Sequence, residues 1–222
     1  MRWTGKDAAR RCLLILAAAV AGAAAWAPHA ASKGRPVSWR ELRYEGVVAQ
    51  SDWYTCGPAA AATLLHHYFG IPATEEEMLE LALGAMADGG QNPGAGIHAA
   101  ALVRSLTEKG LPVRGYRVEP GSLAAYFRQG GLPVIVHVTR PEPHYVVAVG
   151  LVGDWVLLAD PSWGRRLVRW DELAEEKGYS GVALVPLPQT ELAARARALQ
   201  EEALSWAAGR LAQLRRRGGS WR

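Results

Sequence analysis

Cys56 stands where a helix is expected to begin. It is followed by Gly57, Pro58 and an apolar, alanine-rich run, and proline is tolerated in the first turn of a helix because its missing N–H has no helical partner there. Unpaired N–H groups and the positive end of the helix dipole favour a thiolate at such a position. The sequence therefore predicts a nucleophile at the start of a helix over residues 58–69.

A nucleophilic cysteine needs a base, and His144 is the best placed histidine for that task. It follows the proline-rich segment 141–143 and begins a predicted strand, so its ring is expected at a sheet edge beside a loop. Two other histidines lie about three turns further along the helix of Cys56, one opens a later helix, and one is in the middle of an apolar strand. These less suitable histidines are His66, His67, His98 and His137.

Asp160 is the expected partner of His144, since a base of this kind needs an acceptor that fixes its tautomer and orientation. Two predicted strands, residues 145–152 and 155–160, are joined by a turn at Gly153 and form a hairpin. The hairpin brings Asp160 back beside His144, allowing for a bulge. Asp160 also precedes a proline, so a plain turn-starting function is the alternative.

Gln50 precedes Cys56 by six residues and is a candidate donor to the oxyanion that forms during acyl transfer. The backbone N–H of Cys56 is the other candidate. A strand predicted at residues 42–50 would end at Gln50 and place its side-chain amide near the nucleophile. The alternative is a solvated glutamine at the end of a strand.

This combination resembles the papain-like cysteine peptidases that process bacteriocin leader peptides after a double glycine. The resemblance implies Cys56 as nucleophile, His144 as base and Asp160 as its orienting partner. It further implies Gln50 as oxyanion donor, no cofactor, and cleavage after small residues such as Gly-Gly. It covers residues 44–187, and the residues that carry it are Gln50, Cys56, Gly57, His144, Tyr145, Asp160 and Pro161.

Two features depart from that family. Leader-cleaving members commonly carry an acidic residue before the cysteine, whereas Thr55 stands there in this chain. Such members are also commonly the cytosolic front domain of an ABC exporter, whereas neither membrane spans nor a phosphate-loop motif follow here. We therefore expect the thiol chemistry to be retained and the recognition of a leader helix to be lost.

Residues 1–31 have the layout of a secretory signal peptide. A basic start is followed by an uncharged run at residues 12–25 and then by small residues. The run is shorter than the ~18 residues of a membrane-spanning helix, so cleavage is favoured over a permanent anchor. We expect an exported protein, periplasmic or extracellular, with membrane contact only through an uncleaved signal segment.

Removal of the signal peptide changes the charge balance. Four of the 25 basic and one of the 21 acidic residues lie in it, so the net charge falls from +4 to +1. A protein of such low net charge is not expected to bind nucleic acid. Cys12 is lost as well, which leaves Cys56 without a disulfide partner and favours a chemical function for its thiol.

The hydrophobic periodicity changes half-way along the chain and predicts an α+β fold, with an N-terminal helical layer packed on a C-terminal antiparallel sheet. Further helices are expected at residues 74–83, between a capping box that starts at Thr74 and a stop at Gly84, and at residues 99–109. Short β-branched runs separated by Gly, Pro and Asp are typical of strands. These runs are residues 111–118, 132–139, 145–152, 155–160, 166–170 and 181–187.

The predicted organisation has four parts: a signal peptide (1–31), a linker (32–41), a papain-like peptidase domain (42–188) and an amphipathic C-terminal helix (189–217). An apolar seam with spacings of three or four residues is expected to dock the last helix on the domain. The seam consists of Leu192, Ala196, Leu199, Ala203 and Trp206.

Three other features have plainer interpretations. The adjacent His66 and His67 point to different faces of a helix and lack suitably spaced cysteine or carboxylate partners, so no metal site is expected. The glycine-rich segment 88–96 lacks the flanking elements of a phosphate loop and is predicted to be a mobile surface loop. Trp163 is predicted to lie in the core or at a rim, where it would line a cleft.

The sequence as a whole predicts an exported thiol peptidase that acts on a peptide or protein substrate through an acyl-enzyme. The same site in a cell-wall peptide amidase or an acyltransferase is one alternative. A non-catalytic peptide-binding module is the other. An envelope or exporter component is a further expected partner.

Overall fold

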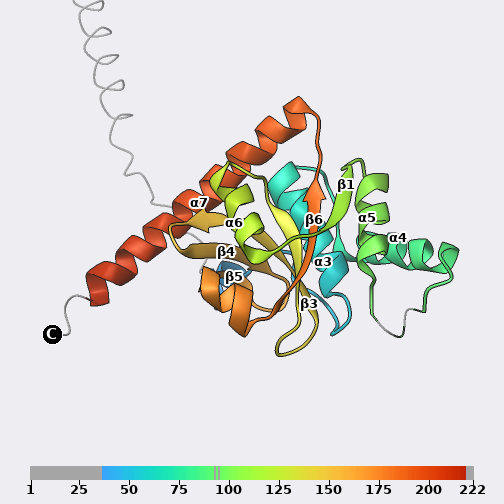
Figure 1. The fold of residues 1–222 in the computed structure, drawn as a ribbon, viewed down its shortest axis with the longest axis horizontal. Helices are drawn as coiled ribbons and strands as arrows, with labels where there is room; N and C mark the ends of the chain where they lie inside the picture. The colour runs from blue at the N-terminus through green and yellow to red at the C-terminus, as the bar shows by residue number, and fades with distance from the viewer. Residues whose placement is uncertain (1–36, 93, 95, 219–222) are drawn as a thin grey trace, which may run out of the picture. The chain divides into compact units, whose positions relative to one another are not determined.

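A six-stranded antiparallel sheet forms the centre of the computed structural model, which describes residues 37–92, 94 and 96–218 (Figure 1). The predicted signal peptide and the first part of the predicted linker lie outside the described residues. Contacts group the chain into Met1–Val37 and Ser38–Arg222, and the elements below belong to the second unit. None of the helices in the described part of the chain is both long and apolar enough to cross a membrane.

The sheet confirms the predicted fold class, because each of the six predicted runs overlaps one strand, although β3, β5 and β6 begin one or two residues earlier than predicted. All neighbouring strands are antiparallel, in the order β1-β6-β2-β3-β4-β5, so the last strand of the sequence lies between β1 and β2. The strands are β1 (Val113–Arg117), β2 (Val134–Val138), β3 (His144–Val152), β4 (Trp155–Asp160), β5 (Gly164–Arg169) and β6 (Tyr179–Pro186).

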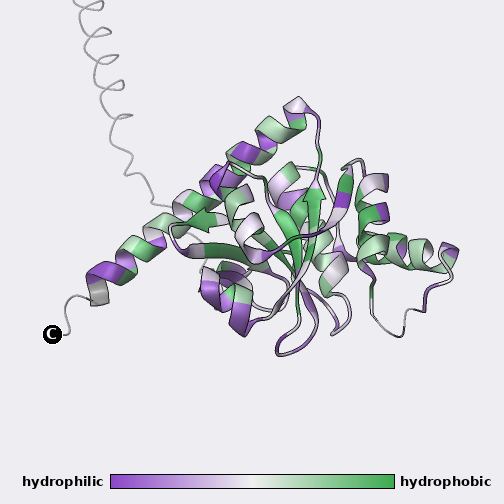
Figure 2. Ribbon diagram, in the orientation of Figure 1, coloured by the Kyte–Doolittle hydropathy of each residue, from purple (hydrophilic) through white to green (hydrophobic). Residues whose placement is uncertain are grey.

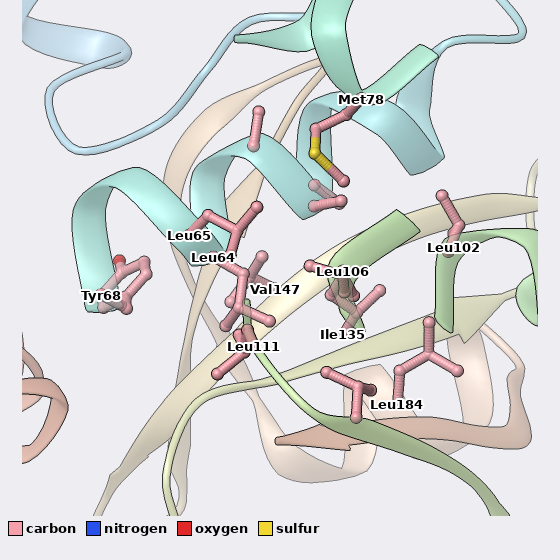
Figure 3. Close-up of a cluster of buried hydrophobic side chains, with 14 of the residues drawn as sticks. Leu64, Leu65, Tyr68, Met78, Leu102, Leu106, Leu111, Ile135, Val147 and Leu184 are labelled. Atoms are coloured by element: carbon pink, nitrogen blue, oxygen red, sulfur yellow. The ribbon is translucent and has the colours of Figure 1, made fainter. Parts of the chain in front are cut away.

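Helices from the first half of the chain pack on one face of the sheet and form the main core with it (Figure 3). All eight residues of the first of them are buried, because small side chains let it approach two other helices and two strands closely. Leu64 and Leu65 follow it, and full burial of such a side chain stabilises the fold by roughly 1.5–3 kcal/mol. This layer consists of α3 (Cys56–Thr63), the π-helix η1 (Leu64–Phe69), α4 (Glu75–Asp88) and α5 (Ala99–Glu108).

The opposite face of the sheet packs against α6 (Pro120–Arg128), a helix that the sequence analysis missed. Pro120 occupies its first turn, where the fixed φ of proline suits a helix. Leu123 and Phe127 of this helix join the second apolar cluster, which includes Val136 and Val146 of the sheet. With only nine residues, α6 shows too few periods for its apolar spacing to stand out.

The strand predicted at residues 42–50 is wrong. The short helix α2 (Trp39–Arg43), which starts with a capping box at Ser38, extends across the predicted boundary between linker and domain. The following segment is extended but bonds to other partners than a strand: the Val48 N–H donates to the Thr63 hydroxyl at 2.9 Å, and the Gln50 N–H donates to a turn carbonyl at 3.0 Å. The apolar alternation of this segment reflects contact with the helical layer and not sheet pairing.

The stop predicted at Gly84 is also wrong, because α4 continues to Asp88 and is capped by Gly89. A glycine inside a helix costs about 1 kcal/mol relative to alanine. Burial of Ala82, Ala85 and Met86 on either side of it offsets that cost. The capping box predicted at the start of this helix is present between Thr74 and Glu77.

The C-terminal helix α7 (Thr190–Gly218) packs on η1 and on β3. Figure 2 shows hydrophilic and hydrophobic residues interleaved along it. Ala196 is fully buried, and Ala203 and Trp206 pack on the main core, while Leu199 is only half-buried. The contact also uses Gln200, whose side-chain amide donates to the Val149 carbonyl at 2.6 Å, a polar contact that the apolar seam could not predict.

Candidate active site

Cys56 is the first residue of α3, and a tight turn leads into it. The Thr55 hydroxyl closes this turn, because it accepts from the Asp52 N–H at 3.1 Å and donates to the Asp52 carbonyl at 3.0 Å. Thr55 and Cys56 are 1% and 8% exposed, so the thiol lies just below the surface. The first N–H groups of a helix have no partner within it, which suits this position to an anionic group.

Gly57 sets how closely α3 approaches its neighbours. A Cβ atom at this position would lie 3.0 Å from Leu102 Cδ1 and 3.3 Å from Tyr145 Cδ2. A side chain here would require Leu102 and Tyr145 to shift by a few tenths of an ångström. The absence of one keeps Cys56 near the beginning of β3, where His144 lies.

His144 opens β3 and Asp160 ends β4, and the two side chains are in contact. The distance from His144 Nε2 to Asp160 Oδ1 is 2.9 Å. Because Val147 lies opposite Ala159, the same register sets Asp160 opposite Val146, so His144 is its diagonal neighbour on the same face. The expected bulge is present further along the hairpin, after Ala148.

Asp160 binds His144 and also stabilises the turn that follows β4. Its Oδ1 atom also accepts from the backbone N–H groups of Ser162 at 2.9 Å and Trp163 at 3.2 Å. Its other carboxylate oxygen lies 3.5 Å from Arg166 Nη1. Both interpretations of Asp160 therefore describe real contacts, and the turn fixes the carboxylate that faces His144.

The surroundings of His144 favour its protonated form. Burial lowers the pKa of His144, but hydrogen bonds and charge interactions with Asp160 and Cys56 outweigh this effect and raise it to about 9. Burial raises the pKa of Asp160, yet the hydrogen bond and charge of His144, together with Ser162 and Arg166, leave it below its ordinary value. At neutral pH the site thus holds an imidazolium beside a carboxylate, and Cys56 interacts with the same ring.

Gln50 is fixed from two directions. Its Nε2 donates to the Asp52 carbonyl at 2.8 Å, and its Oε1 accepts from the Ser162 hydroxyl at 2.7 Å. Its backbone N–H donates to the Pro161 carbonyl at 3.0 Å. Gln50 therefore joins the turn before Cys56 to the turn after Asp160, and its amide has a second hydrogen with which to meet a bound group.

Two hollows flank the site. The Cys56 hollow, of about 590 Å³, contains the thiol, and the His144 hollow, of about 220 Å³, contains the imidazole, Asp160 and Gln50. Trp53, Glu142 and Pro143 line both, so these residues form the border between them. A peptide that passes this border would meet the thiol on one side and the imidazole on the other.

Three residues to which the sequence analysis gave no function, Tyr145, His137 and His98, line the Cys56 hollow. His137 lies directly opposite Tyr145 in the β2–β3 register, and the two ring centroids are 4.8 Å apart. Burial and then the charge of Cys56 raise the pKa of Tyr145 to about 12. The sequence signal that could have found this pair is the alternation along the two predicted strands, which sets His137 and Tyr145 on one face of the sheet.

The two remaining histidines of the described residues lie in η1, beyond the far end of α3 from Cys56. His66 is exposed and His67 is half-buried. Burial, followed by the charges of His66 and Arg165, lowers the pKa of His67 to about 4. Within the described residues, no cluster of three or more His, Cys, Asp or Glu side chains is suited to a metal ion.

A family model described as the peptidase C39 family matches residues 45–191, which include the whole site. The chain belongs to the peptidase C39 family. The resemblance to double-glycine peptidases inferred from the sequence is therefore confirmed. The matched region ends just after the start of α7.

Two relatives of this peptidase have protease names. The probable functional amyloid protease FapD of Pseudomonas aeruginosa is 32% identical over 153 residues, which are 68% of this chain and 65% of that protein. FapD of Pseudomonas fluorescens is 32% identical over 185 residues, or 79% of this chain and 77% of that protein. The chain thus spans slightly less than two thirds of the first relative. Family and relatives identify a cysteine peptidase, as predicted.

A solved structure has the same fold. It is a double glycine motif protease from an AMS/PCAT transporter in complex with the leader peptide, at 24% identity and a TM-score of 0.52. The match covers 64% of this chain and 91% of that one. This likeness agrees with the papain-like α+β fold of the present chain.

Proposed function

We propose that this peptidase is exported and cleaves peptide bonds after small residues, such as Gly-Gly, with Cys56, His144, Asp160 and Gln50 as its catalytic residues. The observation that supports the proposal best is the 2.9 Å contact of His144 with Asp160 beside a cysteine at the start of a buried helix. A base oriented by a carboxylate and adjacent to a thiol is what acyl transfer through a cysteine requires.

In the proposed mechanism, Cys56 Sγ attacks the carbonyl carbon of the scissile bond. The oxyanion that forms accepts hydrogen bonds from the Cys56 backbone N–H and from the second hydrogen of Gln50 Nε2. His144 then gives its proton to the leaving amine, and the C–N bond breaks to leave a thioester. Water, deprotonated by His144, attacks this thioester and releases the acid, while Asp160 holds the ring throughout.

The walls of the Cys56 hollow support the proposed preference for small residues. Gly57 and Gly96 line it without side chains, and the Tyr145 ring lies against the start of α3. Glycine in the substrate would allow its backbone to approach the thiol closely in an extended conformation. Larger residues before the cut would meet Tyr145 or α3.

The proposed substrates are peptides or proteins of an export system. Two relatives are named functional amyloid proteases, and the structural neighbour is a double glycine motif protease of a transporter. The layout of residues 1–31 supports export of this chain to the periplasm or beyond. Thr55 closes the turn before Cys56 in place of an acidic residue, which supports a change in leader recognition.

A peptide library with varied residues on both sides of the cut tests the proposal. We expect cleavage of Gly-Gly peptides, trapping of the acyl-enzyme at Cys56 by mass spectrometry, and an N-terminus of the exported protein between residues 25 and 32. Efficient cleavage after bulky residues would contradict the size preference. Release of cell-wall peptides without cleavage of the library would favour the amidase alternative.

A further inference from the structure

A groove rich in arginine crosses the surface between α2, β5 and α7. It has a volume of about 600 Å³ and contains a single carboxylate, that of Glu45, among its described lining residues. We call it the arginine groove, after its side chains Arg43, Arg165, Arg166 and Arg210.

Aromatic rings lie beside three of these guanidinium groups, the most distant being Arg166 at 5.8 Å from the Trp163 centroid. Arg43 lies over the Trp163 ring at 4.8 Å from its centroid, and Arg165 lies over the Trp206 ring at 3.8 Å. Trp163 is 58% exposed, so its ring is open to a ligand. Guanidinium groups that are already ordered lose less entropy when they bind a carboxylate.

Part of the positive charge in the groove is not matched by carboxylates. Arg165 pairs with Glu45, and Arg166 pairs with Asp160. Arg43, in contrast, donates to the Trp163 carbonyl at 2.6 Å, and Arg210 donates to the Gln213 side chain at 3.4 Å, both neutral groups. The groove therefore presents a surplus of positive charge to an acidic ligand.

The arginine groove is adjacent to the His144 hollow, because Trp163 and Arg166 line both. The groove and the Cys56 hollow share no described lining residue. The described lining of the Cys56 hollow also includes neither lysine nor arginine. The cationic surface thus extends from only one side of the site.

The proposed mechanism assigns a direction to these two sides. The residue before the cut becomes joined to Cys56 Sγ, so it lies in the Cys56 hollow. His144 must reach the nitrogen of the leaving amine, so the residue after the cut lies on the side of the imidazole. The segment released first is therefore the one that passes toward the arginine groove.

We propose that the arginine groove binds the substrate segment that follows the cut and selects for acidic side chains in it. The inference rests on the proposed function for its direction. Its place and chemistry rest on the residues that the groove shares with the His144 hollow and on the surplus of arginine. Trp163, and the exposed Trp39 at the far wall, would contact the apolar parts of the same segment.

Paired cleavage assays with the full protein test the inference. The substrates share Gly-Gly before the cut and carry acidic, neutral amide or basic residues in a short segment after it. An exposed ion pair contributes up to about 1 kcal/mol, so kcat/KM is expected to be about fivefold higher for acidic than for neutral segments at low salt. The preference should disappear at high salt because exposed charges are screened.

Two variants of α7 provide a matched comparison. Arg210→Glu reverses a charge in the groove, whereas Arg216→Glu makes the same change on an exposed residue of the same helix outside it. The acidic preference should be lost in the first variant and kept in the second. An equal effect of both variants, or none of either, would overturn the proposal.

A binding measurement separates this inference from the proposed function. Fluorescence anisotropy of a labelled acidic peptide is recorded with Cys56→Ala, alone and combined with each α7 variant. If no Gly-Gly peptide is cleaved, the proposed function fails. Salt-sensitive binding that only Arg210→Glu weakens would still support the groove, and equal binding of acidic and neutral peptides would overturn it.

Discussion

The Cys56 hollow and the arginine groove offer a peptide opposite kinds of surface. The Cys56 hollow is lined by glycine backbone and an aromatic ring beside the thiol, with neither lysine nor arginine in the described lining. The groove presents four arginines on elements that are far apart in the sequence. The two proposals accordingly assign selection by size to the surroundings of the nucleophile and selection by charge to the groove.

Two glycines, one beside the thiol and one beside the arginine groove, differ in what surrounds them. Gly57 is close to the ends of flexible side chains, of Leu102 and Tyr145, which can move by a few tenths of an ångström. Gly164, after the turn of Asp160, has a φ of +76° and its missing Cβ would lie 2.0 Å from the Arg43 carbonyl oxygen. The first glycine serves the fit of a helix, and the second is required by the backbone itself.

Cys56→Ala should have the largest effect, because it removes the group that attacks the substrate in the proposed mechanism. Turnover of every substrate is expected to fall by about 10⁴-fold or more, as for removal of a nucleophile in comparable enzymes. The thermal midpoint should change little, since the side chain is small. Residual cleavage at the wild-type rate would place the nucleophile elsewhere.

Asp160→Asn should have the next largest effect on turnover. Loss of the charge that holds the imidazolium is expected to reduce kcat by about 10²–10⁴-fold. The pKa of His144, raised to about 9 by Asp160 and Cys56 against the effect of burial, should fall, so the alkaline limb of the kcat/KM profile should move to lower pH. An unchanged profile would remove Asp160 from the mechanism.

The same pair makes stability depend on pH. Because His144 has a higher pKa in the folded than in the unfolded protein, the stabilisation is complete below about pH 6.5 and is lost as the pH rises through about 9. Thermal midpoints of the wild type should therefore decline over this range. Asp160→Asn should make this decline smaller.

A substrate change sharpens the size selection. Replacing the glycine before the cut by alanine is expected to reduce kcat/KM by about 10–100-fold, the range that one methyl group reaches in a closed pocket. The same change in the residue after the cut should have a smaller effect, because the proposed contacts with Gly57 and Tyr145 involve only the residue before the cut. Equal effects at both positions would remove the size difference between the sides.

Substitutions of the two glycines should give the smallest effects, and they should differ. Gly164→Ala is expected to destabilise the fold by about 2 kcal/mol or more, since positive φ and a backbone contact are both unfavourable for alanine. Gly57→Ala should cost about 1 kcal/mol while reducing activity, because the neighbouring side chains can shift but Cys56 moves with them. Thermal denaturation and kcat measure the two effects.

Much of the fold could be predicted because local patterns were consistent with the final structure. The six strands follow from β-branched runs between turn residues, and the start of α4 from its capping box at Thr74. The predictions at residues 42–50 and at Gly84 failed where packing was stronger than a local preference. Helix α6 was missed because nine residues carry too weak a period.

The sequence by itself determined the parts of the site that are close together along the chain. Cys56 begins a helix because Gly57, Pro58 and a run of alanines follow it, and one hairpin of tight turn and alternating strands is sufficient to bring Asp160 to His144. In such a segment the chain has few alternative conformations, so residue types at short spacing fix the contact.

Only the tertiary structure decided the contacts between distant segments. The Ser162 hydroxyl meets Gln50 across 112 residues, and Arg43 meets the Trp163 carbonyl across 120. Periodicity tells which face of an element is apolar, but which elements meet and at what distance depends on the combined packing of the whole core. For that reason the orientation of Gln50 depends on the turn after Asp160, and the arginine groove exists only because α2, β5 and α7 pack side by side.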